Sequence, residues 1–405
     1  MRGCTVLIPL ADADRPTCGG KAGALGDLVR AGLPVPDGFV VPVAAHRGSD
    51  APGDRPVPPD LHAALTDALH ALGDVPVAVR SSAGHEDGTH ASAAGQHATV
   101  LGVRDVADVV DAVRACWTSL HAPGAVAYRA ATAGPGHPVM GVLVQRLVDA
   151  DIAGVLFTRD DGTVLIEASW GLGATVVGGT VTPDAHRVQG DGTVTRTVAD
   201  KRTRADRVGT RIVVRDVPDG DRLRPALDDA TAVRLADLGR RAADLLGAPQ
   251  DVEWAVADGT AWVLQARPVT SEPPTGAPTA AARALDGGAP DGVATDLLTG
   301  TPGSRGTATG PARVVHGPAD FARVRRGDVL VCRWTDPSWT ALLHLAAGVV
   351  TETGGVLSHA AIVARERGIP AVLGVAHATT ALADGSTLQV DGTTGTVGAP
   401  GAPRT

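Results

Sequence analysis

The sequence has few aromatic residues and few cysteines, and each shortage limits the interpretation. Only 2% of the 405 residues are aromatic, whereas 44% are hydrophobic, so the cores must consist mainly of valine, leucine and alanine. The four cysteines show neither a close pair nor metal-binding spacing, which is typical of buried or incidental thiols in a reducing compartment. They are Cys4, Cys18, Cys116 and Cys332.

The sequence also lacks excess positive charge and long apolar runs. Its formal net charge is -8, which does not favour a nucleic-acid partner. No apolar run approaches the roughly 18 residues of a membrane-spanning helix, and no signal peptide is recognisable, so we expect a soluble, cytoplasmic protein without membrane contact. The length predicts two or three domains.

Lysine is nearly absent, because Lys21 and Lys201 are the only two in the chain. Lys21 follows a glycine pair at 19–20, and this arrangement suits phosphate binding because it combines exposed backbone N–H groups with a point positive charge. The spacing and the missing Ser/Thr exclude a Walker A element. An ordinary surface loop is the alternative interpretation.

The most informative stretch runs from Thr351 to Pro370 and places a histidine beside a glycine pair. Glycines 354–355 predict a turn, Ser358 predicts a side-chain N-cap, and residues 360–367 predict a short helix that ends at a glycine. His359 would lie at the helix N-terminus, where unpaired N–H groups and the helix dipole favour an anion. A neutral imidazole there is a competent nucleophile, although a capped helix with a surface histidine explains the same pattern.

This stretch resembles the phosphohistidine motif of the dikinase family, which includes phosphoenolpyruvate synthase, pyruvate phosphate dikinase and rifampin phosphotransferase. The similarity is long and nearly ungapped around Gly-Gly-x-x-Ser-His. It implies that His359 is the catalytic residue that carries a phosphoryl group, and that its small domain swings between two active sites.

Two early motifs resemble the nucleotide-binding domain of the same family. Gly-Gly-Lys-x-x-x-Leu-Gly at 19–26 is similar to its start, and Arg80-Ser-Ser-Ala is followed at the expected interval by Ala-Gly-Gln at 94–96. A strand that ends in arginine can bind phosphate through two N–H groups, or it can form an exposed ion pair. One departure is Ser-Ala-Ala-Gly at 92–95, where the family has an aromatic residue.

A predicted β-hairpin carries a second polar pair. Segments 249–254 and 261–268 alternate in polarity and are joined by Asp-Gly at 258–259. Glu253 and Gln265 can face each other there, and their oxygens suit the Mg²⁺ that accompanies ATP, although ordinary cross-strand polar contacts are the alternative. Asp-Val-Glu-Trp and Leu-Gln-Ala-Arg-Pro resemble the family's metal and nucleotide motifs.

The resemblance implies a set of nucleotide-binding residues and a domain order. ATP would contact Lys21, Arg80, Gly95, Thr99, Gln145, Glu253, Gln265 and Arg267, with Glu253 and Gln265 also binding the metal. Without the resemblance, Gln145 is a polar residue on a half-buried strand. Glu167 could be catalytic or structural, and we favour a structural or substrate-facing role. Asp336 and Trp339 either line an acceptor side of the histidine loop or belong to a packed loop.

We therefore predict a mixed α+β and α/β multidomain fold. An ATP-grasp-like nucleotide-binding module of two subdomains would occupy residues 1–270. A flexible linker rich in Pro, Ala, Thr and Gly would follow at 271–292. A small swivelling β/α phosphohistidine domain would occupy residues 293–400.

The predicted activity is an ATP-dependent phosphotransfer that converts ATP to AMP and phosphate through His359. The pyruvate-binding barrel of complete dikinases and the antibiotic-binding domain of rifampin phosphotransferase have no counterpart in these residues, so the acceptor is open. We expect a small-molecule hydroxyl, such as that of an antibiotic or secondary metabolite. The alternatives are a phosphocarrier that needs a separate acceptor-binding protein, and a non-catalytic regulator, against which the intact motifs argue.

Overall fold

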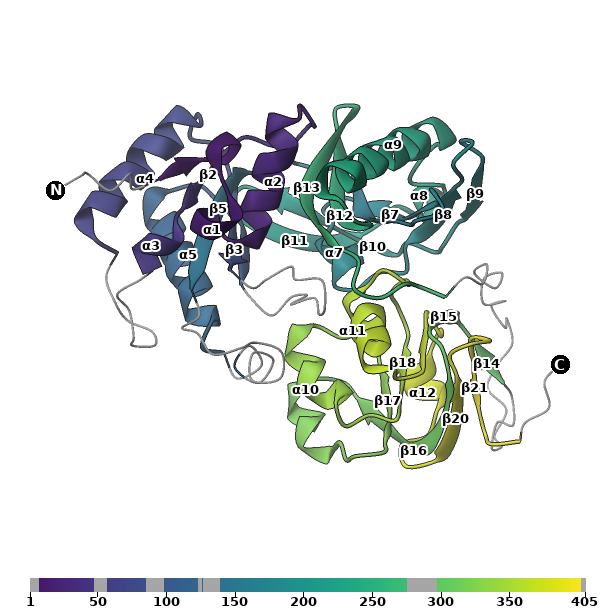
Figure 1. The fold of residues 1–405 in the computed structure, drawn as a ribbon. Coiled ribbons are helices and arrows are strands. Elements are labelled where there is room, and N and C mark those ends of the chain that lie inside the picture. Colours follow the sequence, from purple (N-terminus) through teal and green to yellow (C-terminus); the bar gives the residue numbers. More distant parts are fainter. Residues whose placement is uncertain are drawn as a thin grey trace.

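The computed structural model describes residues 7–46, 57–84, 98–122, 126, 139–274 and 297–401, and Figure 1 shows how their elements are arranged. Within these residues the strands form a five-stranded sheet, a six-stranded sheet, an eight-stranded sheet and a separate hairpin. No described helix is long and apolar enough to cross a membrane.

The first sheet is antiparallel throughout and has the order β1-β2-β5-β3-β4. Its strands are β1 (Ile8–Pro9), β2 (Gly38–Val41), β3 (Val77–Ala83), β4 (Thr99–Val103) and β5 (Met140–Arg146). Its helices are η1 (Leu10–Asp12), α1 (Arg15–Cys18), α2 (Gly20–Arg30), α3 (Val43–His46), α4 (Pro59–Ala71) and α5 (Val106–Ser119). Leucines of α4 and valines of α5 recur at helical spacing and are buried against β3 and β5.

Helix α2 begins at Gly20, inside the segment that the sequence indicates as a phosphate-binding or surface loop. The glycines of 19–26 look like a loop, but several of them permit close packing. Gly19 precedes the helix with a φ of 85°, and a Cβ at Gly23 or Gly26 would overlap the backbone of residues 13–15. Leu25 and Leu28 are then buried in a core shared with the second sheet.

The second sheet is also antiparallel and has the order β13-β12-β6-β7-β8-β9. Its strands are β6 (Ile152–Thr158), β7 (Val164–Trp170), β8 (Asp184–Val188), β9 (Val194–Thr197), β12 (Gln250–Ala257) and β13 (Thr260–Pro268). The separate hairpin comprises β10 (Thr203–Val208) and β11 (Arg211–Asp216), and the helices are α7 (Ala174–Val177), α8 (Asp219–Arg222) and α9 (Asp229–Leu246).

The hairpin of β12 and β13 confirms the predicted one. Asp258 and Gly259 both have positive φ values, 49° and 73°, which match the right-handed twist of the flanking strands. The second lysine is structural, because the ammonium of Lys201 donates to Asp184 at 2.7 Å and neither side chain is exposed to solvent. Asp184 also accepts bonds from two backbone N–H groups.

The third sheet has the order β14-β21-β20-β16-β17-β18-β19-β15, with β16 to β19 parallel. Its strands are β14 (Leu298–Thr299), β15 (Thr301–Ser304), β16 (Thr307–Val315), β17 (Val329–Cys332), β18 (Gly348–Thr351), β19 (Ala371–Leu373), β20 (Thr387–Asp391) and β21 (Thr396–Gly398). Its helices are η2 (Pro318–Arg323), η3 (Pro337–Trp339), α10 (Thr340–Leu343), α11 (His359–Arg367) and α12 (Ala378–Ala381).

The β18–α11–β19 unit positions the histidine. Strands β18 and β19 are parallel neighbours, so the loop 352–358 leaves the carboxyl end of a parallel strand, the edge at which open α/β sheets bind ligands. Figure 1 shows α11 on the side of the third sheet that faces α7 and the second sheet.

Candidate active site

His359 is the first residue of α11 and is buried. Its side chain is 4% exposed, and neither ring nitrogen has a hydrogen-bond partner among the described residues. Burial, and to a lesser extent Arg267, lower its pKa to about 4, and Asp336 opposes this shift. The imidazole is therefore neutral at pH 7 with one unprotonated ring nitrogen, and its burial excludes the alternative of a surface histidine.

The helix ends of α11 were predicted from the sequence with one error. Gly368 ends the helix in the left-handed conformation, as expected, and Ser358 occupies the N-cap position. The Ser358 hydroxyl does not accept a helix N–H group, however, but donates to the Gly355 carbonyl at 2.8 Å. The N–H groups at this end of α11 are thus not consumed by a side-chain cap.

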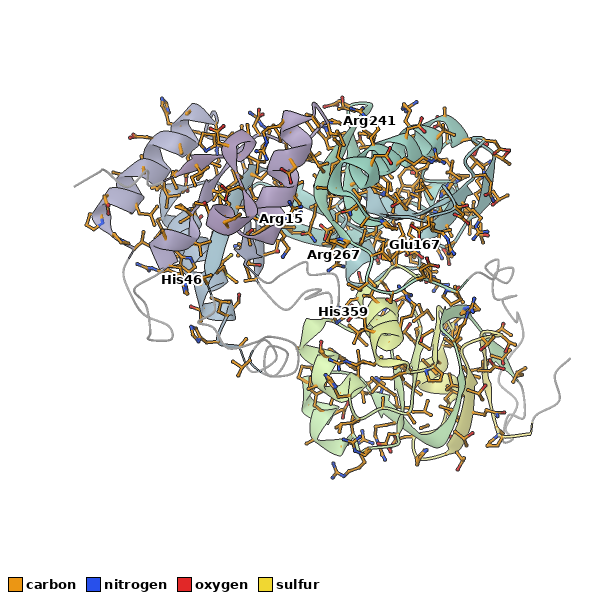
Figure 2. The ribbon with its side chains drawn as sticks, in the orientation of Figure 1. Arg15, His46, Glu167, Arg241, Arg267 and His359 are labelled. Atoms are coloured by element: carbon orange, nitrogen blue, oxygen red, sulfur yellow. The ribbon has the colours of Figure 1, made fainter. Side chains whose placement is uncertain are left out.

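Arg267 lies on β13 and reaches the histidine from the other side. Its guanidinium donates to Asp251 of β12 through Nε at 2.8 Å, and both side chains are nearly buried. Figure 2 shows Arg267 on the edge of the second sheet nearest to His359. A cation fixed beside a neutral nucleophile can stabilise the phosphates of a substrate between them.

The predicted metal pair lies on the same two strands as Asp251 and Arg267, and a second arginine contacts it from the first sheet. Glu253 and Gln265 are direct cross-strand partners in the β12–β13 register, as the sequence predicts. Arg80 of β3 donates to Glu253 at 3.2 Å, and its buried Nε has no hydrogen-bond partner in the part of the chain that the structure describes. Thr99 is the cross-strand neighbour of Arg80 on β4. The two antiparallel sheets therefore meet at a carboxylate, an amide and two arginines.

Lys21 lies in the first turn of α2, beside the strand that carries Arg80. The N–H of Ala22 donates to the Ser82 hydroxyl at 3.1 Å, and a Cβ at Gly19 would overlap the Ser82 carbonyl. Gly19 therefore lets the start of α2 approach β3 closely. This contact brings the Gly-Gly-Lys and Arg-Ser-Ser-Ala segments together.

Comparison with protein families identifies both halves of this arrangement. Residues 52–284 match the model described as pyruvate phosphate dikinase, AMP/ATP-binding domain, and residues 324–395 match that of the PEP-utilising enzyme, mobile domain. The chain belongs to the dikinase family. The predicted fold class is thereby confirmed, with an ATP-binding domain followed by a mobile domain.

The chain is similar in sequence to proteins that are named phosphoenolpyruvate synthase. The chain is 36% identical over 96% of its length to a "Probable phosphoenolpyruvate synthase" of Methanothermobacter thermautotrophicus, of which it spans 62%. It is 32% identical over 94% of its length to the "Phosphoenolpyruvate synthase" of Aeropyrum pernix, of which it spans 56%. The structure of a D-alanine–D-alanine ligase from Bacillus anthracis aligns with 62% of this chain. The alignment includes 56% of the ligase, with 12% sequence identity and a TM-score of 0.29.

Among the described residues predicted from the dikinase resemblance, Gln145 is bonded away from the others. Gly95 lies outside the described residues. Gln145 is 2% exposed on β5, and its amide donates to the Pro36 carbonyl at 2.9 Å, a bond that supports the sheet. A nucleotide-binding role for either residue remains a prediction.

The two candidates for the acceptor side differ in position. Asp336 is exposed, accepts bonds from the N–H and hydroxyl of Ser338, and influences the pKa of His359. Trp339 is 5% exposed and packs edge-on against Phe321 at a ring distance of 5.0 Å. Trp339 therefore belongs to the core, so the packed-loop alternative describes it, whereas a contact between Asp336 and an acceptor remains a prediction.

Glu167 of β7 is the residue that sequence reasoning left unassigned. Its carboxylate accepts bonds from the N–H groups of Val356, at 2.6 Å, and Leu357, at 3.2 Å, in the histidine loop. Burial raises the pKa of Glu167 to about 7, whereas these two N–H groups and Arg365 lower it. A glutamate inside an apolar strand is the signal that could have singled it out.

Proposed function

We propose that this chain transfers a phosphoryl group from ATP to His359 and then to an acceptor. The observation that carries the proposal is a buried, neutral histidine on one domain within the electrostatic influence of Arg267 on the other. Arg267 and Glu253 lie in the region matched by the AMP/ATP-binding domain, and His359 lies in the mobile-domain match. The chain spans about three-fifths of the relatives it matches, so their complete activity is part of the proposal.

In the proposed first step, a ring nitrogen of His359 forms a bond to phosphorus as a phosphoanhydride bond of ATP breaks. One water breaks the second phosphoanhydride bond, so the nucleotide is released as AMP together with one inorganic phosphate, while one phosphoryl group remains on the histidine. Arg80 and Arg267 neutralise the phosphate charge, and the buried position of His359 excludes bulk water from the nitrogen–phosphorus bond.

Mg²⁺ suits the residues opposite the histidine. The facing Glu253 and Gln265 supply one carboxylate and one amide oxygen, and a magnesium ion that is otherwise bound by phosphates and water needs only one or two such ligands. The buried, unpartnered Nε of Arg80 beside Glu253 supports an anionic ligand at the same place. When bound, the ion would neutralise phosphate charge.

The acceptor is the less constrained part of the proposal. The names of the relatives make pyruvate the first acceptor to test, and nothing in them favours an antibiotic. A hydroxylated small molecule is our proposed acceptor class, because the enol form of pyruvate presents a hydroxyl as well. The second candidate is transfer through a separate acceptor-binding protein.

The test is to incubate the protein with ATP and Mg²⁺ and to quantify AMP, ADP and phosphate. Intact-mass spectrometry at alkaline pH then detects the phosphorylated protein. AMP and phosphorylation that disappear in His359→Gln, but persist in the exposed control His316→Gln, are expected. ADP as the only product, or phosphorylation that survives His359→Gln, would contradict the mechanism. Adding pyruvate or hydroxylated antibiotics identifies the acceptor by its mass.

A further inference from the structure

Glu167 connects the two domains through the histidine loop. It projects from β7 of the nucleotide-binding domain, and the hydrogen bonds that it makes among the described residues go to Val356 and Leu357 of the mobile domain. Figure 2 shows Glu167 at the side of the second sheet that faces α11. The carboxylate therefore binds backbone N–H groups two and three positions before the phosphoryl-accepting histidine.

The loop is shaped to receive this carboxylate. A Cβ at Gly355 would overlap the Glu167 carboxyl group, so only glycine leaves room for it. Arg365 of α11 donates to the Val356 carbonyl at 2.7 Å and the Gly303 carbonyl at 3.0 Å, which fixes the loop within its own domain. The N–H groups that Glu167 binds are thus held rigidly relative to α11.

The surroundings of Glu167 are apolar and come from both domains. Val155, Phe157 and Val176 of the nucleotide-binding domain are buried together with Leu357 and Ile362 of the mobile domain. Beyond this cluster, the Thr353 hydroxyl donates to the Gly179 carbonyl at 2.7 Å. In such surroundings the hydrogen bonds to a carboxylate are strong and directional, so they fix the orientation of the histidine loop. The apolar contacts constrain the rotation of the mobile domain less.

We propose that Glu167 is a positioning residue that holds the mobile domain in the arrangement in which His359 receives the phosphoryl group. This inference rests on the proposed function, since it assigns a role within the first half-reaction. The carboxylate touches neither ATP nor the histidine ring in this scheme. It acts through the loop backbone, and its two bonds must break before the mobile domain can move to an acceptor.

The proposal predicts different effects on the rate of His359 phosphorylation and on the affinity for ATP. A merely structural residue would change both of them or neither. Hydrogen bonds to a charged group typically alter an equilibrium by roughly 10- to 100-fold. We expect Glu167→Gln, which keeps the shape but presents an NH₂ group to one loop N–H, to slow phosphorylation of His359 by up to that factor. The affinity for ATP should remain within about twofold, because the nucleotide residues are untouched.

The experiment measures domain position and half-reaction rate on the full chain. Small-angle X-ray scattering without nucleotide reports compactness, quenched-flow mass spectrometry reports the rate of phosphohistidine formation, and an ATP titration reports affinity. The matched control is Glu352→Gln, because that carboxylate also accepts two bonds, both from Thr379, but within the mobile domain. We expect Glu167→Gln to enlarge the particle and slow phosphorylation, and Glu352→Gln to do neither.

A second pair of variants tests the contact itself. Gly355→Ala should displace the Glu167 carboxylate and slow phosphorylation about as much as Glu167→Ala does. In the double variant the overlap is gone, so adding Gly355→Ala to Glu167→Ala should cost less than about twofold. If the two substitutions instead slow phosphorylation additively, the contact between Glu167 and the loop is not the cause of the slower rate.

The outcomes distinguish this inference from the proposed function. If the wild-type protein forms no phosphohistidine, the proposed function fails, while scattering still reports whether Glu167 holds the domains together. An unchanged scattering profile in Glu167→Gln overturns the positioning role. A phosphorylation rate equal to wild type, or a loss confined to ATP affinity, overturns it as well.

Discussion

The protonation state of His359 provides the sharpest test of the active site. An exposed histidine with an ordinary pKa of about 6.5 would be about three-quarters protonated at pH 6. Burial and Arg267 lower the pKa of His359 to about 4, at which about 1% is protonated at pH 6. The difference amounts to about 3 kcal/mol against the charged form.

The assay is a pH titration of the ring carbon resonances by NMR after selective labelling of the histidines. His359 is assigned by the resonance that vanishes in His359→Gln. Its shift should stay constant from pH 8 to pH 5. Arg267→Gln should raise the pKa of His359 only partly, since burial is the larger cause. A His359 that titrates near pH 6.5 would refute the buried, neutral nucleophile.

Two further predictions concern the metal pair and stability. Glu253→Gln should slow phosphohistidine formation by about 10²–10³-fold with partial recovery at high Mg²⁺, and equal rates at every Mg²⁺ concentration would contradict the metal role. Lys201→Met should lower the unfolding free energy by about 3–5 kcal/mol, because it leaves the buried Asp184 unpaired; denaturant titration that finds less than about 1 kcal/mol would contradict this.

The sequence was sufficient to predict the structural features that depend on residues close together in the chain. The β12–β13 hairpin follows from alternating polarity and the Asp-Gly turn, and it places Glu253 opposite Gln265 without further information. The end of α11 at Gly368 follows from the same local rules. The error at α2 arose because glycine favours both loops and close packing, and only the contacts of Gly23 and Gly26 distinguish the two.

The sequence by itself determined the family, the histidine at the start of α11 and the polar pair on the hairpin, because each depends on contiguous residues and local geometric rules. Only the tertiary structure decided that His359 is buried and neutral, that Trp339 packs in the core, and that Glu167 binds the histidine loop. The last contact joins residues 189 positions apart in the chain. Burial and long-range hydrogen bonds depend on which surfaces meet when the domains pack, and local sequence patterns do not specify that.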